Sequence, residues 1–310
     1  MMTIPIITRR TCSLGASLAV FALAASVGCQ RSAELGPVAS ASASKSIRAV
    51  FTQGGGEEAG SAAAAAATGT GWATLKGRFI YGGDDPPPMQ PYNVNKDQAA
   101  CTINGKAPLQ ETLLVDSATK GIANVAIFVR SASRVHESAA TPAAENVEFD
   151  QKNCVFQTHV FPLTLGEIMV IKNSDPVGHN TNISGKNGLN QTIEAGKSID
   201  FKPQKEEAIP VAVRCSIHPW MSAYLLPREN GYYAVTGKDG TFEVANLPAG
   251  EELEFQVWHE SGTGPGGALV LTTPEVKELK WSKKGRFKLK LSEDEVKELA
   301  VTVPPDALGG

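Results

Sequence analysis

Residues 215–221, with the sequence CSIHPWM, place a thiol, an imidazole and a thioether three residues apart in one short stretch of chain. The stretch directly follows an apolar run that ends near Val213, so we expect a loop between two strands to carry Cys215, His218 and Met221. Thiolate and thioether sulfur are soft ligands and imidazole is a borderline one, and together they suit copper in both oxidation states. The spacing therefore indicates a metal site.

A second imidazole is needed to complete such a site, and it must come from elsewhere in the chain. His179 is the best candidate, because it follows the apolar run 168–171 and precedes Asn180. It lies 36 residues before Cys215, a separation of two or three short strands, so a neighbouring strand can hold it beside the cysteine loop. Two His and one Cys with a weak axial Met form the blue-copper arrangement.

Each of these residues also has an ordinary structural interpretation. A buried Cys is often a small hydrophobe, a Met fills core space, and a His before Pro lies in a turn. The joint spacing favours the metal site over these separate explanations. Of the other histidines, His159 is expected in a core or rim position, His136 in a loop and His259 at the end of a strand.

Short apolar runs separated by turn-rich sequence predict the elements that position these residues. The runs favour many short strands and an all-β Greek-key sandwich with a C-terminal β extension. Asp239-Gly240 predicts a hairpin between residues 232–235 and 241–244, since both residues tolerate positive φ. The predicted strands lie at 72–81, 113–115, 125–129, 155–160, 168–171, 199–201 and 209–213, with edge strands between 287 and 303.

At the cysteine loop the sequence resembles the type 1 copper (cupredoxin) family, and its Cys-x2-His-x2-Met spacing is similar to that of amicyanin. The resemblance implies one type 1 copper site with His179, Cys215, His218 and Met221 as ligands. It further implies that Asn180 ties the two ligand loops together and that His218 is the exposed edge of the site. Residues 72–228 would be a cupredoxin-like domain. Residues 229–310 resemble a carboxypeptidase-regulatory or transthyretin-like β-module.

The five cysteines divide by position. Cys12 falls in a predicted signal segment, Cys29 in a predicted lipidation site and Cys215 in the metal site, which leaves Cys101 and Cys154. These two either form a disulfide or remain free thiols. A disulfide would enclose a loop of some fifty residues and stabilise the fold by about 4 kcal/mol, and an exported compartment permits it.

The N-terminal sequence predicts export. Two arginines precede an apolar run at 14–25, which is typical of a secretory signal in residues 1–29. Residues 26–29 resemble a bacterial lipobox ending in Cys29, and the alternative is ordinary cleavage nearby after a small residue such as Ala24. The Ala/Ser/Gly-rich residues 30–71 predict a disordered linker. We therefore expect a protein of the bacterial periplasm or cell envelope that is anchored to the membrane by lipid.

The charge balance and the missing motifs exclude several functions. With a net charge of −3 the chain has no basic field to attract nucleic acid. The sequence has no His-x-His pair for further copper sites and no Ser-His-Asp or phosphate-binding motif, so we expect no enzyme. The expected function is one-electron transfer between redox proteins of the envelope. The alternatives are a surface-tethered binding module with a structural metal, and copper storage or delivery.

Overall fold

The computed structural model describes residues 69–309, all within the compact unit that spans residues 62–310. The predicted signal, Cys29 and the linker up to residue 68 lie outside the described residues. The described part is nearly all β, with sixteen strands in four sheets and a few single-turn helices. In this part no helix has the length and apolarity that a membrane span requires. The predicted all-β class is confirmed.

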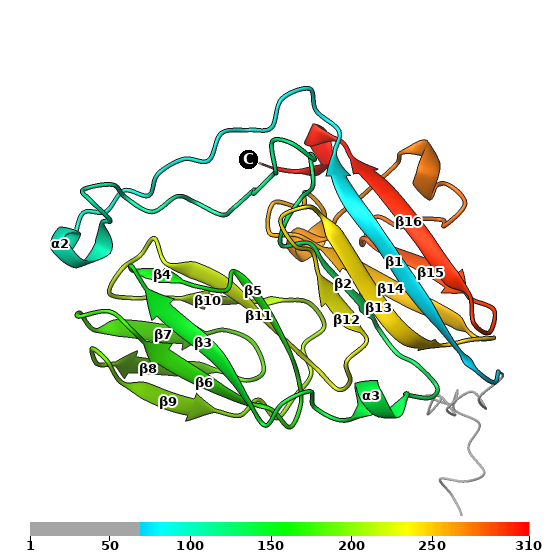
Figure 1. The fold of residues 1–310 in the computed structure, drawn as a ribbon, viewed down its shortest axis with the longest axis horizontal. Coiled ribbons are helices and arrows are strands. Elements are labelled where there is room, and N and C mark those ends of the chain that lie inside the picture. The colour runs from blue at the N-terminus through cyan, green and yellow to red at the C-terminus, as the bar shows by residue number, and fades with distance from the viewer. Residues whose placement is uncertain (1–68, 310) are drawn as a thin grey trace, which may run out of the picture. The chain divides into compact units, whose positions relative to one another are not determined.

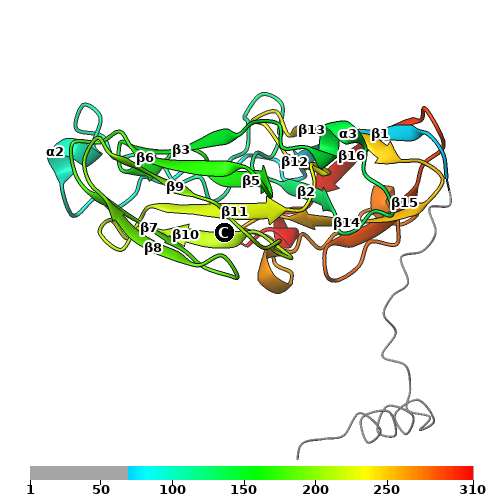
Figure 2. The same ribbon diagram turned by 90° about the horizontal axis from the view of Figure 1, so that it is seen from below.

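Two sheets form the sandwich that holds the predicted ligands, and they appear as separate layers in Figure 2. Buried side chains from both sheets, among them Phe149, Ile171, Val213 and Leu225, meet in one core. The five-stranded sheet has the order β5 (Val160–Thr164), β11 (Ser222–Arg228), β10 (Val211–Arg214), β7 (His179–Ile183) and β8 (Leu189–Ile193). The four-stranded sheet has the order β4 (Val155–Phe156), β3 (Asn146–Lys152), β6 (Ile168–Asn173) and β9 (Ser198–Phe201).

The strands of this sandwich follow the two-residue period of a half-buried sheet. In β6 the side chains of Met169, Ile171 and Asn173 are buried, and the residues between them are half-buried. The apolar run at 155–160, predicted as one strand, is divided: β4 ends at Phe156, and β5 begins at Val160 in the other sheet. The chain therefore passes from one layer to the other between these two strands.

The remaining strands form two more sheets around a second core, which includes Phe79, Val129, Val244, Phe255 and Val301. One sheet has the order β13 (Thr241–Pro248), β1 (Trp72–Tyr81) and β16 (Val296–Val303), which lie side by side in Figure 1. The other has the order β12 (Tyr233–Val235), β2 (Ala126–Val129), β14 (Glu252–Trp258) and β15 (Arg286–Lys290).

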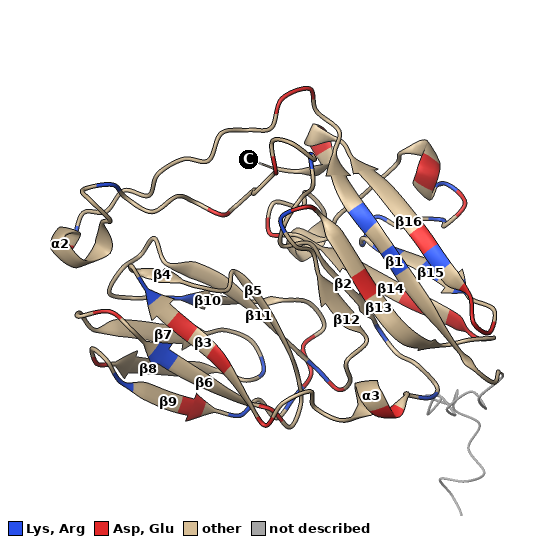
Figure 3. Cartoon of the chain, in the orientation of Figure 1, with Lys and Arg blue, Asp and Glu red and all other residues tan. Residues whose placement is uncertain are grey.

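The outward face of the three-stranded sheet carries charges of both signs. In Figure 3 the ribbons of β1 and β16 together are coloured at both basic and acidic residues, and Lys76 pairs with Glu298 at 3.0 Å. Both side chains are exposed, so this pair contributes little to stability. It does keep the outer face of these strands polar.

The strand pairing corrects the predicted boundary between residues 72–228 and 229–310. β1 pairs with β13 and β16, and β2 pairs with β12 and β14, so two strands expected in the cupredoxin-like domain belong to the C-terminal sheets. The reason is burial, because Leu75 and Phe79 of β1 pack in the second core with Val244. The sandwich that holds the ligands begins near residue 146.

The predicted hairpin at Asp239-Gly240 is also wrong. Gly240 has φ +80°, so a turn is present, but β12 pairs with β2 and β13 pairs with β1. The chain changes sheets at this turn, where the carbonyl of Gly240 accepts a hydrogen bond from the N–H of Phe79 in β1. The residues Asp239 and Gly240 correctly predicted a turn, but they did not predict which strand β13 would pair with.

Between β1 and β2 the chain makes a long excursion, residues 82–125, which we call the connecting segment (Figure 1). It leaves the second core and packs Val94 and Cys101 into the core of the ligand-bearing sandwich. Its one α-helical turn is α2 (Gln98–Cys101), and a second, α3 (Glu137–Ala140), follows β2. Three 3₁₀ turns lie at Pro265–Gly267, Pro274–Val276 and Pro305–Ala307. The predicted strand at 113–115 is absent here, with only an isolated bridge between Val115 and Ile122.

Candidate metal centre

His179 and the cysteine loop meet because β7 and β10 are adjacent antiparallel strands. Arg214 is paired with Asn182, so Cys215, the next residue after β10, lies beside the start of β7, where His179 is the first residue. The ligand atoms of His179, Cys215 and His218 all lie within 4.8 Å of one another, and all three residues are buried. The two imidazoles face each other with their Nδ1 atoms 2.9 Å apart.

Backbone hydrogen bonds shape the cysteine loop around the sulfur. The N–H groups of His218 and Asn180 each donate to Cys215 Sγ at 3.3 Å. The N–H of Met221 donates to the carbonyl of His218 at 3.0 Å, so the loop closes as a tight turn. Met221 is fully buried beside it. Its role as an axial ligand stays a prediction.

Asn180 links the two ligand-bearing elements. Its Oδ1 accepts from the Ser216 N–H at 3.2 Å and from the Ser216 hydroxyl at 2.9 Å, while its Nδ2 donates to Asn190 of β8 at 2.9 Å. Because Ser216 directly follows Cys215, these bonds fix the cysteine relative to β7. The role of Asn180 beside a bound metal stays a prediction.

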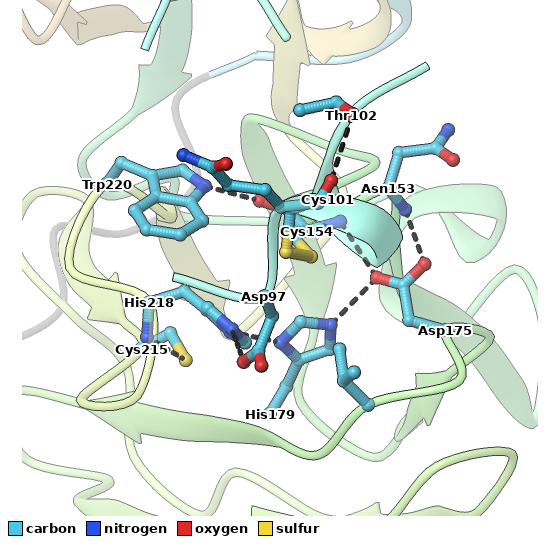
Figure 4. The surroundings of a disulfide bond; sticks show 12 residues. Asp97, Cys101, Thr102, Asn153, Cys154, Asp175, His179, Cys215, His218 and Trp220 are labelled. Atoms are coloured by element: carbon cyan, nitrogen blue, oxygen red, sulfur yellow. Dashed lines mark hydrogen bonds and ion pairs between the residues drawn. A yellow bond between two sulfur atoms is a disulfide. The ribbon is translucent and has the colours of Figure 1, made fainter. Parts of the chain in front are cut away.

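Two carboxylates hold the outer nitrogens of the imidazoles, as Figure 4 shows. His179 Nε2 lies 2.7 Å from Asp175 Oδ2, and His218 Nε2 lies 2.8 Å from Asp97 Oδ2. A carboxylate accepts, so each Nε2 is the protonated donor and each Nδ1 turns inward. The arrangement directs two nitrogen donors at the space beside the Cys215 sulfur.

Asp175 also supports the turn between β3 and β4. Its two oxygens accept the N–H groups of Asn153 at 2.6 Å and Cys154 at 2.8 Å. Both residues have positive φ, 55° and 53°, a conformation that Asn153 tolerates but that is unfavourable for Cys154. One carboxylate therefore stabilises a strained hairpin turn and orients His179.

The electrostatics of the cluster favour a thiolate. Burial by itself raises the pKa of Cys215, but hydrogen bonds from His179 and from the surrounding backbone N–H groups outweigh burial and lower that pKa below its usual value. Burial opposes charge on His179, yet the Asp175 and Cys215 contacts raise its pKa. Burial lowers the pKa of His218, against the opposing effect of Asp97. The thiolate is the form of cysteine that binds metal.

His218 is not the exposed edge of the site, contrary to the expectation from the family resemblance. Its side chain has no exposed area, and its Nε2 contacts Asp97 of the connecting segment. Trp220 is half-buried and donates its indole N–H to the carbonyl of Cys154 at 3.0 Å. Only Ser216 and Pro219 of the cysteine loop are exposed.

Cys101 and Cys154 form a disulfide with a Cα–Cα distance of 5.0 Å, across a sequence separation of 53 residues. Within residues 69–309 the remaining cysteine is Cys215, which is buried and free. The disulfide ties α2 to the turn between β3 and β4 (Figure 4). The sulfur atoms of both cysteines lie within 4.8 Å of a ring nitrogen of His218.

The other histidines lie away from this cluster. His159 is buried and paired with Glu260, and His136 accepts from the N–H of Ser138 at the start of α3. His259 is fully buried, and burial lowers its pKa to about 4. These positions agree with the structural roles that the sequence analysis assigned to His159, His136 and His259.

Asp97 and Asp175 are the two site residues that sequence analysis missed. Asp175 stands four residues before His179, so a search for carboxylates near the candidate ligands could have found it. Asp97 lies 121 residues from His218 and comes from a segment with no periodic pattern. No local signal connects Asp97 to the cysteine loop.

The donor set fits a copper ion. One thiol with a lowered pKa and two inward-facing imidazole nitrogens supply the soft and borderline ligands that copper prefers. Each imidazole is oriented by a carboxylate, the usual outer partner of a metal-bound histidine. The cluster is also fully enclosed, which protects the sulfur from solvent.

No protein family model and no curated protein sequence matches the chain. Among solved structures, a methionine-to-alanine mutant of amicyanin in the Cu(I) form matches at 14% identity and TM-score 0.24, over 30% of this chain and 100% of amicyanin. A reduced proline-to-glycine mutant of amicyanin matches at 15% identity and TM-score 0.25, over 33% of this chain and 98% of the other. A copper-containing nitrite reductase from Thermus scotoductus SA-01 matches at 18% identity and TM-score 0.26, over 29% of this chain and 26% of the reductase.

Proposed function

We propose that the protein binds one copper ion at His179, Cys215 and His218, with Met221 as axial ligand, and carries single electrons between redox proteins of the cell envelope. The observation that supports this most directly is the convergence of the two Nδ1 atoms, 2.9 Å apart, beside a buried thiol of lowered pKa. When bound, copper supplies reversible one-electron chemistry.

The chain's own residues suit rapid transfer, because they hold the ligands nearly fixed. Asp175 and Asp97 fix the two imidazole rings, and Asn180 fixes the cysteine loop. Two backbone N–H groups point at the sulfur and stabilise its negative charge in either oxidation state of the metal. A site that keeps its shape when the charge changes has little rearrangement to complete before the electron moves.

The exposed part of the cysteine loop suggests where a redox partner docks. Pro219 is exposed and Ile217 and Trp220 are half-buried, which gives a small apolar surface next to the buried ligands. Electron-transfer encounters use small interfaces, so a brief contact through this surface is consistent with the proposed function. Export, lipid anchoring at Cys29 and the absence of an enzymatic activity are parts of the same proposal.

Optical and redox titration of the copper-loaded protein tests the function. We expect an intense visible band from thiolate-to-copper charge transfer, which bleaches when one electron per protein is added and returns on reoxidation. The Cys215→Ser variant keeps the carboxylate-held imidazoles but loses the band and the reversible cycle. A wild-type protein that binds copper stoichiometrically and stays colourless would contradict the electron-carrier function.

Two other functions predict different results. A surface-tethered binding module keeps its partner after Cys215→Ser, whereas an electron carrier loses its redox exchange. A copper-delivery protein transfers Cu(I) to an acceptor such as a soluble chelator within minutes. The enclosure of all three ligands, each with 2% or less exposed area, favours retention of the metal and thus the carrier.

A further inference from the structure

The outer nitrogen of His218 is held by a residue from a distant part of the chain. Asp97 Oδ2 lies 2.8 Å from His218 Nε2, and the two residues are 121 positions apart. The imidazole has no exposed area, while the Asp97 side chain is 35% exposed. The carboxylate therefore closes the site from the solvent side and keeps contact with water on its other face.

The connecting segment holds Asp97 through its local structure. Asp97 precedes α2, and its carbonyl accepts the N–H groups of Ala100 and Cys101 at 2.9 Å. It has φ 48° and ψ 38°, the left-handed conformation that Asp tolerates better than most residues. Gln98 adds a hydrogen bond from Nε2 to the Val94 carbonyl at 2.9 Å. The position of the carboxylate is thus set by the turn that α2 begins.

The disulfide connects this turn to the rest of the site. Cys101 ends α2 and is bonded to Cys154, whose N–H donates to Asp175. Asp175 in turn holds His179. One covalent link therefore joins the two carboxylate–imidazole pairs, and Figure 4 shows it between them.

We propose that Asp97 is a positioning residue for the metal ligand His218 and that the Cys101–Cys154 disulfide holds it in place. The proposal goes beyond the electron-carrier function and rests on it only in taking His218 as a ligand. Removing Asp97 frees the ring to rotate about its side-chain bonds and opens the site to water. Removing the disulfide loosens α2 and so weakens the same contact at a distance.

Hydrogen exchange of the His218 ring tests the contact in the metal-free, full-length protein. In the wild type the Nε2–H is expected to be visible by NMR and protected from exchange. Asp97→Ala is expected to speed this exchange at least tenfold, and Asp97→Asn, whose Oδ1 still accepts, is expected to retain part of the protection. Asp85→Ala, an exposed position in the same segment, is the matched control and should leave the exchange unchanged.

Metal affinity tests the consequence. With Co²⁺ as a probe that does not change oxidation state, Asp97→Ala is expected to weaken binding 10- to 100-fold, the usual effect of removing an outer partner of a ligating histidine. Asp97→Asn should restore most of the affinity. The Cys101→Ser/Cys154→Ser double variant, or the wild type under reductant, should weaken binding in the same direction.

These readouts separate this proposal from the proposed function. Equal Nε2–H exchange and equal Co²⁺ affinity in wild type and Asp97→Ala would overturn the positioning role, whatever the protein does with copper. A wild type that binds Co²⁺ tightly but shows no redox cycle with copper would overturn the electron-carrier function alone. If the double cysteine variant does not fold, Asp97→Asn and Asp97→Ala still decide the question.

Discussion

Replacing Asp175 by alanine removes three hydrogen bonds at once, and its effect on stability can be worked out from the structure. The carboxylate accepts from His179 Nε2 at 2.7 Å, from the Cys154 N–H at 2.8 Å and from the Asn153 N–H at 2.6 Å. Its side chain is only 4% exposed, so water does not readily replace the lost partners. The two N–H groups belong to a turn whose residues both have positive φ.

Hydrogen bonds to a charged group contribute roughly 1.5–3 kcal/mol each, and a buried donor left without a partner costs roughly 1–3 kcal/mol. Bonds that share one carboxylate are not additive, so the alanine variant is expected to lose about 3–5 kcal/mol of unfolding free energy, the usual cost of removing one partner of a buried charged pair. In Asp175→Asn one amide oxygen can still serve Cys154 and His179, and only the bond to Asn153 is lost. The asparagine variant should lose about 1–2 kcal/mol.

Urea unfolding of the metal-free protein measures these differences, and its pH dependence tests their origin. Burial opposes charge on Asp175, but the bonds from His179, Cys154 and Asn153 lower its pKa. The contribution of Asp175 to the free energy of unfolding is therefore complete above its pKa in the unfolded chain, about 3.9. It is lost as the pH falls through the lower pKa of the folded state. His179 has a raised pKa, so its contribution is full below about 6.5 and is lost as the pH rises through its folded pKa.

Both groups are charged in the folded state near pH 5.5, so the comparison is best made there. The difference between wild type and Asp175→Asn should shrink as the pH falls below about 4, since protonated Asp175 resembles the amide. An Asp175→Ala variant within about 0.5 kcal/mol of the wild type at pH 5.5 would refute the role assigned to this carboxylate.

Two further predictions follow from the cysteine loop and the disulfide. Asn180→Ala removes the hydrogen bonds to Ser216 and should weaken Cu²⁺ binding about 10- to 100-fold and shift the visible band. Asn190→Ala leaves the bonds to Ser216 in place, so its Cu²⁺ affinity and its visible band should match those of the wild type. Replacing Cys101 and Cys154 together by alanine frees a loop closed over 53 residues and should cost about 4 kcal/mol in urea unfolding. An unchanged urea midpoint on reduction of the wild type would argue against a structural disulfide.

The sequence was sufficient for the parts of the site that depend on local spacing. The three-residue spacing from Cys215 to His218 identified the loop that brings the imidazole of His218 close to the Cys215 sulfur. His179 was found because an apolar run precedes it. The all-β class followed from short apolar runs in the same way. These features are encoded over a few residues, so one sequence reveals them.

Long-range pairing was not predictable from the same signals. The paired residues of β1 and β13 are 163 to 176 positions apart in the sequence, and nothing in the alternation of β1 itself says which sheet it joins. The contact of Asp97 with His218 depends on the whole path of the connecting segment. The burial of His218 followed from that contact, so the exposed edge expected from the family resemblance was wrong.

X-ray absorption at the copper edge of the stoichiometrically loaded protein tests the central claim most directly. We expect a first coordination shell with one short sulfur distance, from Cys215, two imidazole nitrogens, from His179 and His218, and a longer, weaker sulfur contact from Met221. Cys215→Ser should remove the short sulfur distance and leave the nitrogens. A wild-type shell made only of nitrogen and oxygen, or one that is unchanged by Cys215→Ser, would contradict it.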